Sequence, residues 1–325
     1  MKKAVKIFVF IVIGLIIVAG ASLTYVTVAL PDLGDAPDLK VEITPQRLER
    51  GKYLVNNVIP CLDCHSTRDF SKFSGPIDTN TLGSGGEKFD KNIGLPGEYY
   101  APNITPYHLK DWTDGEILRA ITTGVSKDGH ALFPIMPYQY FGKMDIEDIY
   151  SIIVYIRTLP VKETQSLVSK SDFPMNFIIN TIPQKADFKP MPLPNDEIAY
   201  GRYLVNAALC SECHTKREKG EPLPGMDFAG GREFNLPDAT ITTANITPDM
   251  DSGIGSWSKE QFVNRFKSFS DSAAYKPTPV VKGGFQTVMP WTTFSNMKTS
   301  DIEAIYAYLR TVKPVKNQIT KFVAH

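Results

Sequence analysis

The sequence predicts a mainly α-helical protein made of two similar domains in tandem, preceded by one apolar N-terminal helix. Three observations predict this fold class. A run of 24 residues without a charge follows a short basic N-terminus, several later segments occur twice in the same order, and apolar residues recur at helical spacing near the end of both copies. The 325 residues are enough for two domains, and the formal net charge of zero does not suggest a nucleic-acid partner.

The apolar run covers residues 7–30 and reads IFVFIVIGLIIVAGASLTYVTVAL. A helix crosses a bilayer in about 20 apolar residues, so we expect residues 1–30 to be a membrane anchor. Three lysines precede the run, which favours a cytoplasmic N-terminus and places everything after Leu30 outside. The alternative is a cleaved signal peptide, with AGA at 19–21 as its cleavage site. The anchor is favoured because apolar residues continue for nine positions past that site.

The remainder of the chain contains the same unit twice. Matching segments follow one order in residues 31–159, called the first half, and in residues 195–325, the second half. The pairs are GKYLVNNVIPCLDCHST and GRYLVNAALCSECHT, SGGEKF and AGGREF, PNITP and ANITP, DWTDGEILRAI and SWSKEQFVNRF, IMPY and VMPW, and DIEDIYSIIVYIRTL and TSDIEAIYAYLRTV. A unit of this length indicates a duplicated domain rather than a short-period solenoid repeat.

Each half is expected to begin and end with a helix. Thr44 followed by Pro45 predicts a capped start of the first helix, and Asn195, before Asp196 and Glu197, predicts the matching start in the second half. Asp145 is the expected cap of the last helix of the first half. In the second half, Ser300 with Glu303 three residues later predicts a capping box.

The segments between these helices are expected to be loops. Residues 66–106 and 215–248 are rich in Gly, Pro, Asn and Asp, and loops this long need something other than packed secondary structure to hold them. A connector, residues 160–194, joins the halves, and its six prolines predict a semi-rigid extended chain. Four apolar residues of the connector are expected to pack on a domain: Phe173, Phe177, Ile178 and Ile179.

The four cysteines all lie in two copies of Cys-x-x-Cys-His, CLDCH at 61–65 and CSECH at 210–214. A thioredoxin-like redox motif would need a strand-to-helix turn, and no such strand pattern is present. A structural zinc ion needs four ligands, and each copy offers two thiols and one adjacent histidine. A disulfide would not explain the histidine. The pentapeptide is the attachment sequence of c-type haem, which also supplies an apolar plate for the long loops and fits an exported chain.

Each half resembles a class I cytochrome c domain, over residues 45–159 and again over 196–312. The segment from APNITP to IMPY is similar to the cytochrome c subunits of membrane-bound alcohol and sugar-acid dehydrogenases. Those subunits commonly carry three haem domains, whereas this chain has two attachment motifs, and its second half has an insertion before Met289. The resemblance implies two covalently attached haem c groups. Their thioether bonds would come from Cys61, Cys64, Cys210 and Cys213, and their proximal iron ligands would be His65 and His214.

The sixth iron ligand is expected to be a methionine. Two pairs of methionines occupy matching places in the halves: Met136 with Met289, and Met144 with Met297. The resemblance assigns the ligand to the methionine that precedes a proline, which is Met136 in the first half and Met289 in the second. Met144 and Met297 are expected in the core. His108 and His130 have no counterpart in the second half and are expected at the surface.

Two further repeated pairs have structural interpretations. Gly51 and Gly201 are expected to let the first helix of each half approach the last helix closely. Asn103 and Asn245 are expected to hold their loops through hydrogen bonds to the backbone.

The predicted function is that of a membrane-anchored dihaem cytochrome c, an electron carrier rather than an enzyme. It would pass single electrons between a dehydrogenase or quinol-oxidising complex and a terminal acceptor such as an oxidase. The expected location is the cytoplasmic membrane, crossed once, with the haem domains on the periplasmic side. One alternative is a dihaem peroxidase, which needs an open iron position, and another is a fixed electron-relay subunit of a respiratory complex.

Overall fold

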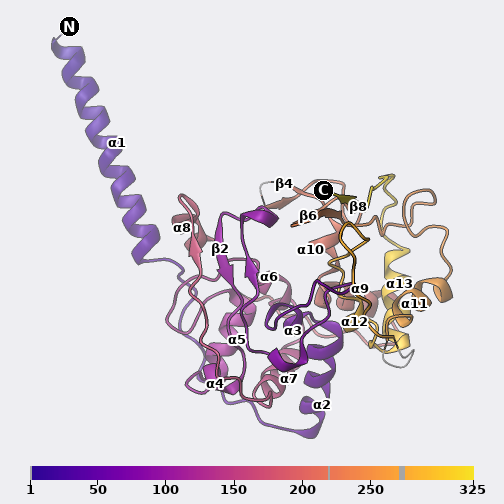
Figure 1. Cartoon of the computed structure of the whole chain (residues 1–325). Helices are drawn as coiled ribbons and strands as arrows, with labels where there is room; N and C mark the ends of the chain where they lie inside the picture. The colour runs from indigo at the N-terminus through magenta and orange to yellow at the C-terminus, as the bar shows by residue number, and fades with distance from the viewer. Residues whose placement is uncertain (1, 219, 271–274) are drawn as a thin grey trace.

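The computed structural model describes residues 2–218, 220–270 and 275–325. One long helix, α1 (Lys2–Val28), stands away from a body in which the first half lies beside the second (Figure 1). No residue of α1 is buried, and the helix is long and apolar enough to cross a membrane by length and composition. Its C-terminal end meets the connector, where the Asn180 side-chain amide donates to the Val26 carbonyl over 3.2 Å.

The first half is built on two helices that pack against each other, α2 (Pro45–Tyr53) and α7 (Ile146–Ile156). Both predicted caps are confirmed: the Thr44 hydroxyl accepts from the Arg47 N–H, and the Asp145 carboxylate accepts from the Glu147 N–H. The last helix buries a mainly apolar face, which follows from the spacing of its isoleucines, and Asp148 and Ser151 are buried with it.

The second half repeats this pair with α9 (Glu197–Ala207) and α13 (Thr299–Leu309). The cap of α9 is Asp196, one residue later than expected, and its carboxylate accepts from the Ala199 N–H. The capping box predicted at Ser300 is wrong. The helix starts at Thr299, so the capping position is Lys298, whose side chain has no acceptor for the free N–H groups of the first turn. The N–H of Lys298 itself donates to the Tyr53 hydroxyl of the first half.

Glycine is required where each helix pair crosses. A Cβ added at Gly51 would lie 1.9 Å from the Ser151 carbonyl oxygen, and one added at Gly201 would lie 1.9 Å from that of Ala304. Real Cβ atoms essentially never approach another heavy atom so closely. The expectation that these glycines permit a close helix approach is therefore confirmed.

Shorter elements fill the space between the long helices. The remaining helices are α3 (Cys61–Cys64), α4 (Pro106–Leu109), α5 (Asp114–Thr123), α6 (Tyr138–Phe141), α8 (Met175–Ile178), α10 (Cys210–His214), α11 (Lys259–Lys267) and α12 (Trp291–Phe294), with a π-helical turn over Leu54–Val58 and 3₁₀ turns over Thr79–Thr81, Lys91–Ile93 and Ile179–Thr181.

The segments expected to be loops also contain short antiparallel strands. One sheet has the order β1 (Lys88–Phe89), β2 (Gly97–Tyr100), β3 (Lys170–Ser171). A second sheet is formed by β4 (Arg217–Glu218) and β5 (Glu221–Pro222). A third has the order β6 (Glu233–Leu236), β7 (Ala239–Thr242), β8 (Phe322–Ala324). These strands have two to four residues, too few for a two-residue alternation to show in the sequence. Much of both segments is irregular, as predicted.

The connector packs less than its composition suggested. Its strand β3 extends the sheet of the first half, and α8 lies beside the end of α1 (Figure 1). Phe177 and Ile179 are half-buried, but Phe173 is 82% exposed and Ile178 is 43% exposed, so the expected packing of these two residues is wrong. The ring contact described for Phe173 is an edge-to-face contact with the Phe177 ring.

The two halves are joined by reciprocal hydrogen bonds between matching positions. The Tyr53 hydroxyl of the first half donates to Asp301 of the second over 2.5 Å, and the Tyr203 hydroxyl of the second donates to Asp148 of the first over 2.5 Å. Burial, supported by the neighbouring carboxylates, raises the pKa of both Tyr53 and Tyr203, so each phenol remains a donor. One continuous core of buried apolar side chains includes residues of both halves.

Candidate functional site

Both Cys-x-x-Cys-His motifs lie on a short helical turn that directly follows the first long helix of their half. The turns are α3 and α10, and none of the four cysteines forms a disulfide in the structure. Burial raises the pKa of Cys61, Cys64 and Cys210 to about 12 each, and it also raises that of Cys213. Burial therefore disfavours the thiolate at all four positions. Among the described residues, no group of three or more His, Cys, Asp or Glu could hold a metal ion.

The histidine of each motif is held by one hydrogen bond of the same kind. His65 Nδ1 lies 2.7 Å from the Pro102 carbonyl oxygen, and His214 Nδ1 lies 2.7 Å from that of Ala244. A carbonyl oxygen can only accept, so Nδ1 carries the proton in both rings and the lone pair is on Nε2. Burial lowers the pKa of His65 and His214, which favours the neutral ring. Metal-binding histidines have this arrangement, with one nitrogen fixed by the protein and the other free to ligate.

The accepting carbonyls belong to the repeated Asn-Ile-Thr-Pro loops. Asn103 is fully buried; its side-chain amide donates to the Lys162 and Thr164 carbonyls, and its side-chain oxygen accepts from Thr105. Asn245 is bound in the same way to Val315 and Thr247. The expectation that these asparagines hold their loops is confirmed, and the structure adds the reason: each loop presents the carbonyl that orients a histidine.

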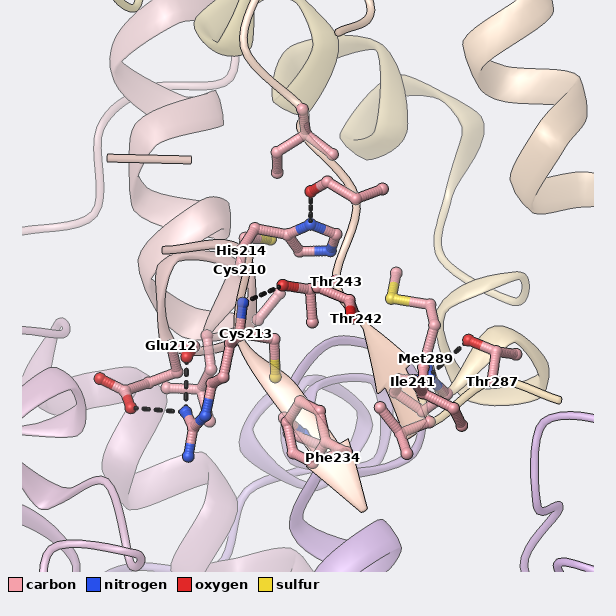
Figure 2. Close-up of a pocket in the computed structure, with 18 of the residues that line it drawn as sticks. Cys210, Glu212, Cys213, His214, Phe234, Ile241, Thr242, Thr243, Thr287 and Met289 are labelled. Carbon is pink, nitrogen blue, oxygen red and sulfur yellow. Dashed lines mark hydrogen bonds and ion pairs between the residues drawn. The ribbon is translucent and has the colours of Figure 1, made fainter. Parts of the chain in front are cut away.

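The two methionines expected as iron ligands occupy corresponding turns. Met136 and Met289 are half-buried, and each precedes a proline and a short helix, α6 or α12. Met289 lines a cavity of about 1250 Å³ together with Cys210, Cys213 and His214. Figure 2 shows the two cysteines and the histidine on one side of this pocket and Met289, on a separate loop, on the other.

The first motif has a smaller share in this cavity. Cys64 lines the same cavity, as do Ile135 and Pro137 on either side of Met136, but Cys61, His65 and Met136 themselves do not line it. The structure therefore brings Cys64 to the edge of a space that contains the second motif. The other matching methionines are core residues as expected, with Met144 at 0% and Met297 at 1% exposure.

The two competing histidines do not enter the site. His130 is exposed and bound to Asp128, as expected of a surface residue. His108 is half-buried beside Trp112 rather than fully exposed, and burial lowers its pKa.

Sequence reasoning missed the residues through which each motif contacts the other half. The Thr293 hydroxyl donates to Asp63, over 3.0 Å to one carboxylate oxygen, and the Tyr140 hydroxyl donates to Glu212 over 2.5 Å. Asp63 and Glu212 occupy the same place within their pentapeptides, and Tyr140 and Thr293 each follow their methionine by four residues. Only this matching of positions could have suggested the pairs, because the partners lie far apart in sequence.

Comparison with known proteins decides the nature of the second half. Residues 198–313 match the sequence profile of the family described as cytochrome c. Residues 198–313 are a cytochrome c domain. The domain covers α9, the CSECH motif, Met289 and α13, so it includes every residue expected to bind a haem in this half.

Longer matches extend over both halves. The chain is 28% identical over 286 residues to the cytochrome c subunit of a quinone-dependent alcohol dehydrogenase from Gluconacetobacter polyoxogenes, covering 82% of this chain and 56% of the relative. It is 28% identical over 297 residues to the fructose dehydrogenase cytochrome subunit of Gluconobacter japonicus, covering 86% and 55%. A dihaem cytochrome c-type protein of Cereibacter sphaeroides is 27% identical over 267 residues, covering 79% and 83%. The chain spans about half the length of the dehydrogenase subunits it matches.

The residues of the cytochrome c domain fit a covalently attached haem c. Two thiols stand at the attachment spacing, the adjacent neutral imidazole has a free Nε2, and a thioether comes from across the cavity. Much of the remaining lining is apolar and includes Phe234, Ile241, Phe266 and Leu309. A cytochrome c domain carries electrons on its haem, so the prediction of an electron carrier rather than an enzyme is supported.

Proposed function

We propose that the chain is a dihaem electron-transfer cytochrome c, with one haem c in the first half and one in the second. Cys61 and Cys64 attach the first haem, with His65 and Met136 as its iron ligands. The second is attached by Cys210 and Cys213 and ligated by His214 and Met289. The proposed domains are residues 31–159 and 195–325, joined by the connector 160–194.

One observation carries this proposal for both halves. His65 and His214 each follow a Cys pair, and each gives its Nδ1 proton to a carbonyl of a matching loop over the same 2.7 Å. The fixed Nδ1–H leaves Nε2 as the only ring atom able to bind a metal. When bound, haem c supplies an iron that changes its oxidation state by one electron. The chain's part is to hold both axial groups in place and to cover the haem with apolar side chains.

The methionines favour a carrier over a peroxidase. A histidine and a methionine would together supply two protein ligands to a haem iron, and a thioether stabilises the reduced iron relative to a second histidine. Met136 and Met289 stand at matching positions in the turn before a short helix. With a methionine available in each half, we expect no open iron position of the kind that a peroxidase requires.

The two sites belong to one structural unit, which suits transfer between them. Cys64 of the first motif and Cys213 of the second line the same cavity, and hydrogen bonds from Thr293 and Tyr140 tie each motif to the other half. We infer that the two motifs would hold their haem groups within this one unit, which would allow an electron to pass between them.

The partners and location follow from α1 and from the relatives. We propose that residues 1–30 anchor the chain in the cytoplasmic membrane, with a cytoplasmic N-terminus and both haem domains on the periplasmic side. The uncharged apolar helix and the preceding lysines support this topology. The electron donor would be a dehydrogenase or quinol-oxidising complex, as in the relatives whose names are those of dehydrogenase cytochrome subunits.

Haem content tests the proposal. The purified chain should keep two haems per chain after denaturation, and Cys61→Ala and Cys210→Ala should each leave one. Met136→Ala should remove half of the near-infrared sulfur-to-iron absorption of the oxidised protein, and Met289→Ala the other half. Met144→Leu and Met297→Leu are matched controls that should leave it unchanged, because they conserve core volume. Removal of all colour by acid-acetone extraction would refute covalent attachment.

The partner is tested by purification of the full chain in mild detergent. A dehydrogenase or quinol-oxidising subunit that co-purifies in fixed ratio would show a subunit role. A chain that purifies alone yet is reduced by such a complex would show a mobile carrier, and a chain that no such complex reduces would contradict the proposed donor.

A further inference from the structure

A segment of the first half reaches over the methionine loop of the second. Residues 68–75 follow the first Cys motif directly and pair with residues 278–288 of the second half. The Phe73 N–H donates to the Thr278 carbonyl, and the Val280 N–H donates to the Ser71 carbonyl, both over 2.8 Å. The buried Gln286 amide donates to the Phe70 and Lys72 carbonyls over 3.0 and 2.9 Å. The contact is thus made from backbone and a buried side chain.

Ser74 is the part of this segment that touches the backbone of the expected iron ligand. Its hydroxyl donates to the Met289 carbonyl over 2.6 Å and accepts from the Trp291 N–H over 3.1 Å, so it binds on both sides of Pro290. The Ser74 N–H donates to Gln286 over 2.8 Å. Ser74 has 0% exposure and a φ of +69°, which is unfavourable for a residue other than glycine. Such a conformation persists where the surroundings fix it, and it recurs at functional sites.

Arg68 connects this contact to the first haem motif. It lies three residues after His65, and its guanidinium donates to the Gly75 carbonyl over 2.8 Å and to the Ser74 carbonyl over 2.7 Å. A weaker contact of 3.4 Å reaches the Val288 carbonyl, just before Met289. A short chain of covalent and hydrogen bonds therefore runs from His65 of the first half to Met289 of the second.

The methionine turn of the first half has a different neighbour. The turn itself has the same hydrogen bond in both halves: the Tyr138 N–H donates to the Met136 carbonyl, and the Trp291 N–H donates to the Met289 carbonyl, each over 2.8 Å. Arg217 corresponds in sequence to Arg68, but it donates to the Tyr140 hydroxyl over 3.2 Å, four residues beyond Met136. Among the described residues, the hydrogen bonds that Met136 makes through its N–H and carbonyl are with Phe133 and Tyr138 of its own half.

We propose that Ser74, supplied by the first half, is a positioning residue for Met289, the thioether ligand of the second haem. This inference rests on the proposed assignment of Met289. Its hydrogen bonds to either side of Pro290 fix the peptide that carries the methionine side chain, so they hold the sulfur toward the cavity. The two halves differ at the methionine backbone: the Met289 carbonyl is bound by Ser74 of the first half, whereas the hydrogen bonds given for the N–H and carbonyl of Met136 are with its own half.

Imidazole binding to the oxidised full-length protein measures how firmly each methionine is held, because imidazole must displace it from the iron. The deciding variant is Ser74→Gly, which removes the hydroxyl and suits the positive φ; Ser74→Ala removes the hydroxyl but keeps the Cβ. Either variant removes the hydroxyl's hydrogen bonds to the Met289 carbonyl and from the Trp291 N–H. Even one such bond of ordinary strength should make imidazole bind one of the two haems at least roughly three- to tenfold more tightly. The potential of that haem should fall, and part of its near-infrared absorption should be lost.

Two controls separate the possible failures. Ser71→Ala makes the same change as Ser74→Ala in the same segment. Among the described residues, the Ser71 hydroxyl donates to Asp69, so this variant should leave imidazole affinity unchanged. Met289→Ala should abolish the near-infrared absorption of one haem. If Met289→Ala has no such effect, the ligand assignment fails. If Met289→Ala does abolish this absorption, and Ser74→Gly keeps two haems with the imidazole affinity and the reduction potentials of the parent, the role of Ser74 is refuted.

Discussion

Substituting alanine for the crossing glycines, Gly51→Ala and Gly201→Ala, should destabilise the protein strongly for so small a change. In an exposed helix interior this change is favourable by about 1 kcal/mol, because glycine loses more backbone entropy on folding. Here the added Cβ would meet a carbonyl oxygen at 1.9 Å, in α7 for Gly51 and in α13 for Gly201.

The size of the effect follows from that contact. Ordinary van der Waals contact begins near 3.4 Å, so the two backbones would have to separate by roughly 1.5 Å. The blocking atom belongs to the backbone of a helix, so no flexible side chain can move aside. Overpacking of this kind costs about 1–3 kcal/mol or more, and we place both glycines at the upper end. After the propensity gain, the expected net loss in unfolding free energy is about 2 kcal/mol for each variant.

Guanidinium chloride unfolding in detergent, followed by far-ultraviolet circular dichroism and by haem absorption, measures this loss. Gly20→Ala is the matched control, since a Cβ there meets nothing within 4 Å, and it should leave the unfolding of the body unchanged. If Gly51→Ala and Gly201→Ala both unfold at or above the denaturant concentration of the parent, the close helix crossing is not present in the protein.

Two further changes test other parts of the structure. Tyr53→Phe and Tyr203→Phe each remove a hydrogen bond to a carboxylate across the interface between the halves. Each should lower the unfolding free energy, measured by denaturant titration, by about 1.5–3 kcal/mol. Tyr107→Phe is the control and should have a smaller effect, because its hydroxyl is exposed. Burial raises the pKa of Glu87 above its ordinary value of 4.5, assisted by Asp63 and opposed by Arg68, so the folded state binds the proton more tightly than the unfolded state. The unfolding free energy of the parent should therefore fall relative to that of Glu87→Gln as the pH rises through and above 4.5. If the difference in unfolding free energy between the two proteins does not change between about pH 4 and pH 8, the burial of this carboxyl is contradicted.

Local signals in the sequence predicted the elements they directly describe. A cap followed by a proline placed the start of α2, and Asp145 placed the start of α7, because these residues act on N–H groups two or three positions away. Ser300 carried an equally good signal and failed. There the helix begins at Thr299, so Ser300 lies inside it and Lys298 is at the cap position. The Lys298 N–H is bound by the Tyr53 hydroxyl, 245 residues away in sequence, and no local pattern reports such a partner. The short strands were missed for lack of length, and the exposure of Phe173 because composition alone suggested burial.

In the candidate site too, the residues that chemistry constrains locally were predicted, and the contacts between distant residues were not. The attachment motifs and their histidines were predicted from residue type and spacing, which chemistry constrains directly, and the choice of Met136 and Met289 came from the family resemblance. The carbonyls that fix the histidines were not predicted, although the repeated Asn-Ile-Thr-Pro loops that present them were. Ser74 gave no signal at all, since its role depends on a partner 215 residues away in sequence.

The contacts between the halves explain why one chain would carry both sites. If the halves were independent domains on a flexible linker, each motif would need only partners of its own. Instead Asp63 and Glu212, inside the motifs, are bound by Thr293 and Tyr140 of the opposite half, and Asp148 and Asp301 are bound by tyrosines in the same crossed manner. Separating the halves would exchange these hydrogen bonds to carboxylates for hydrogen bonds to water and would expose part of the shared apolar core, so it is unfavourable at several points together. The relative position of the two motifs is then fixed by the fold. For an electron carrier this matters directly, because transfer between two centres needs a constant separation and little rearrangement when the charge moves.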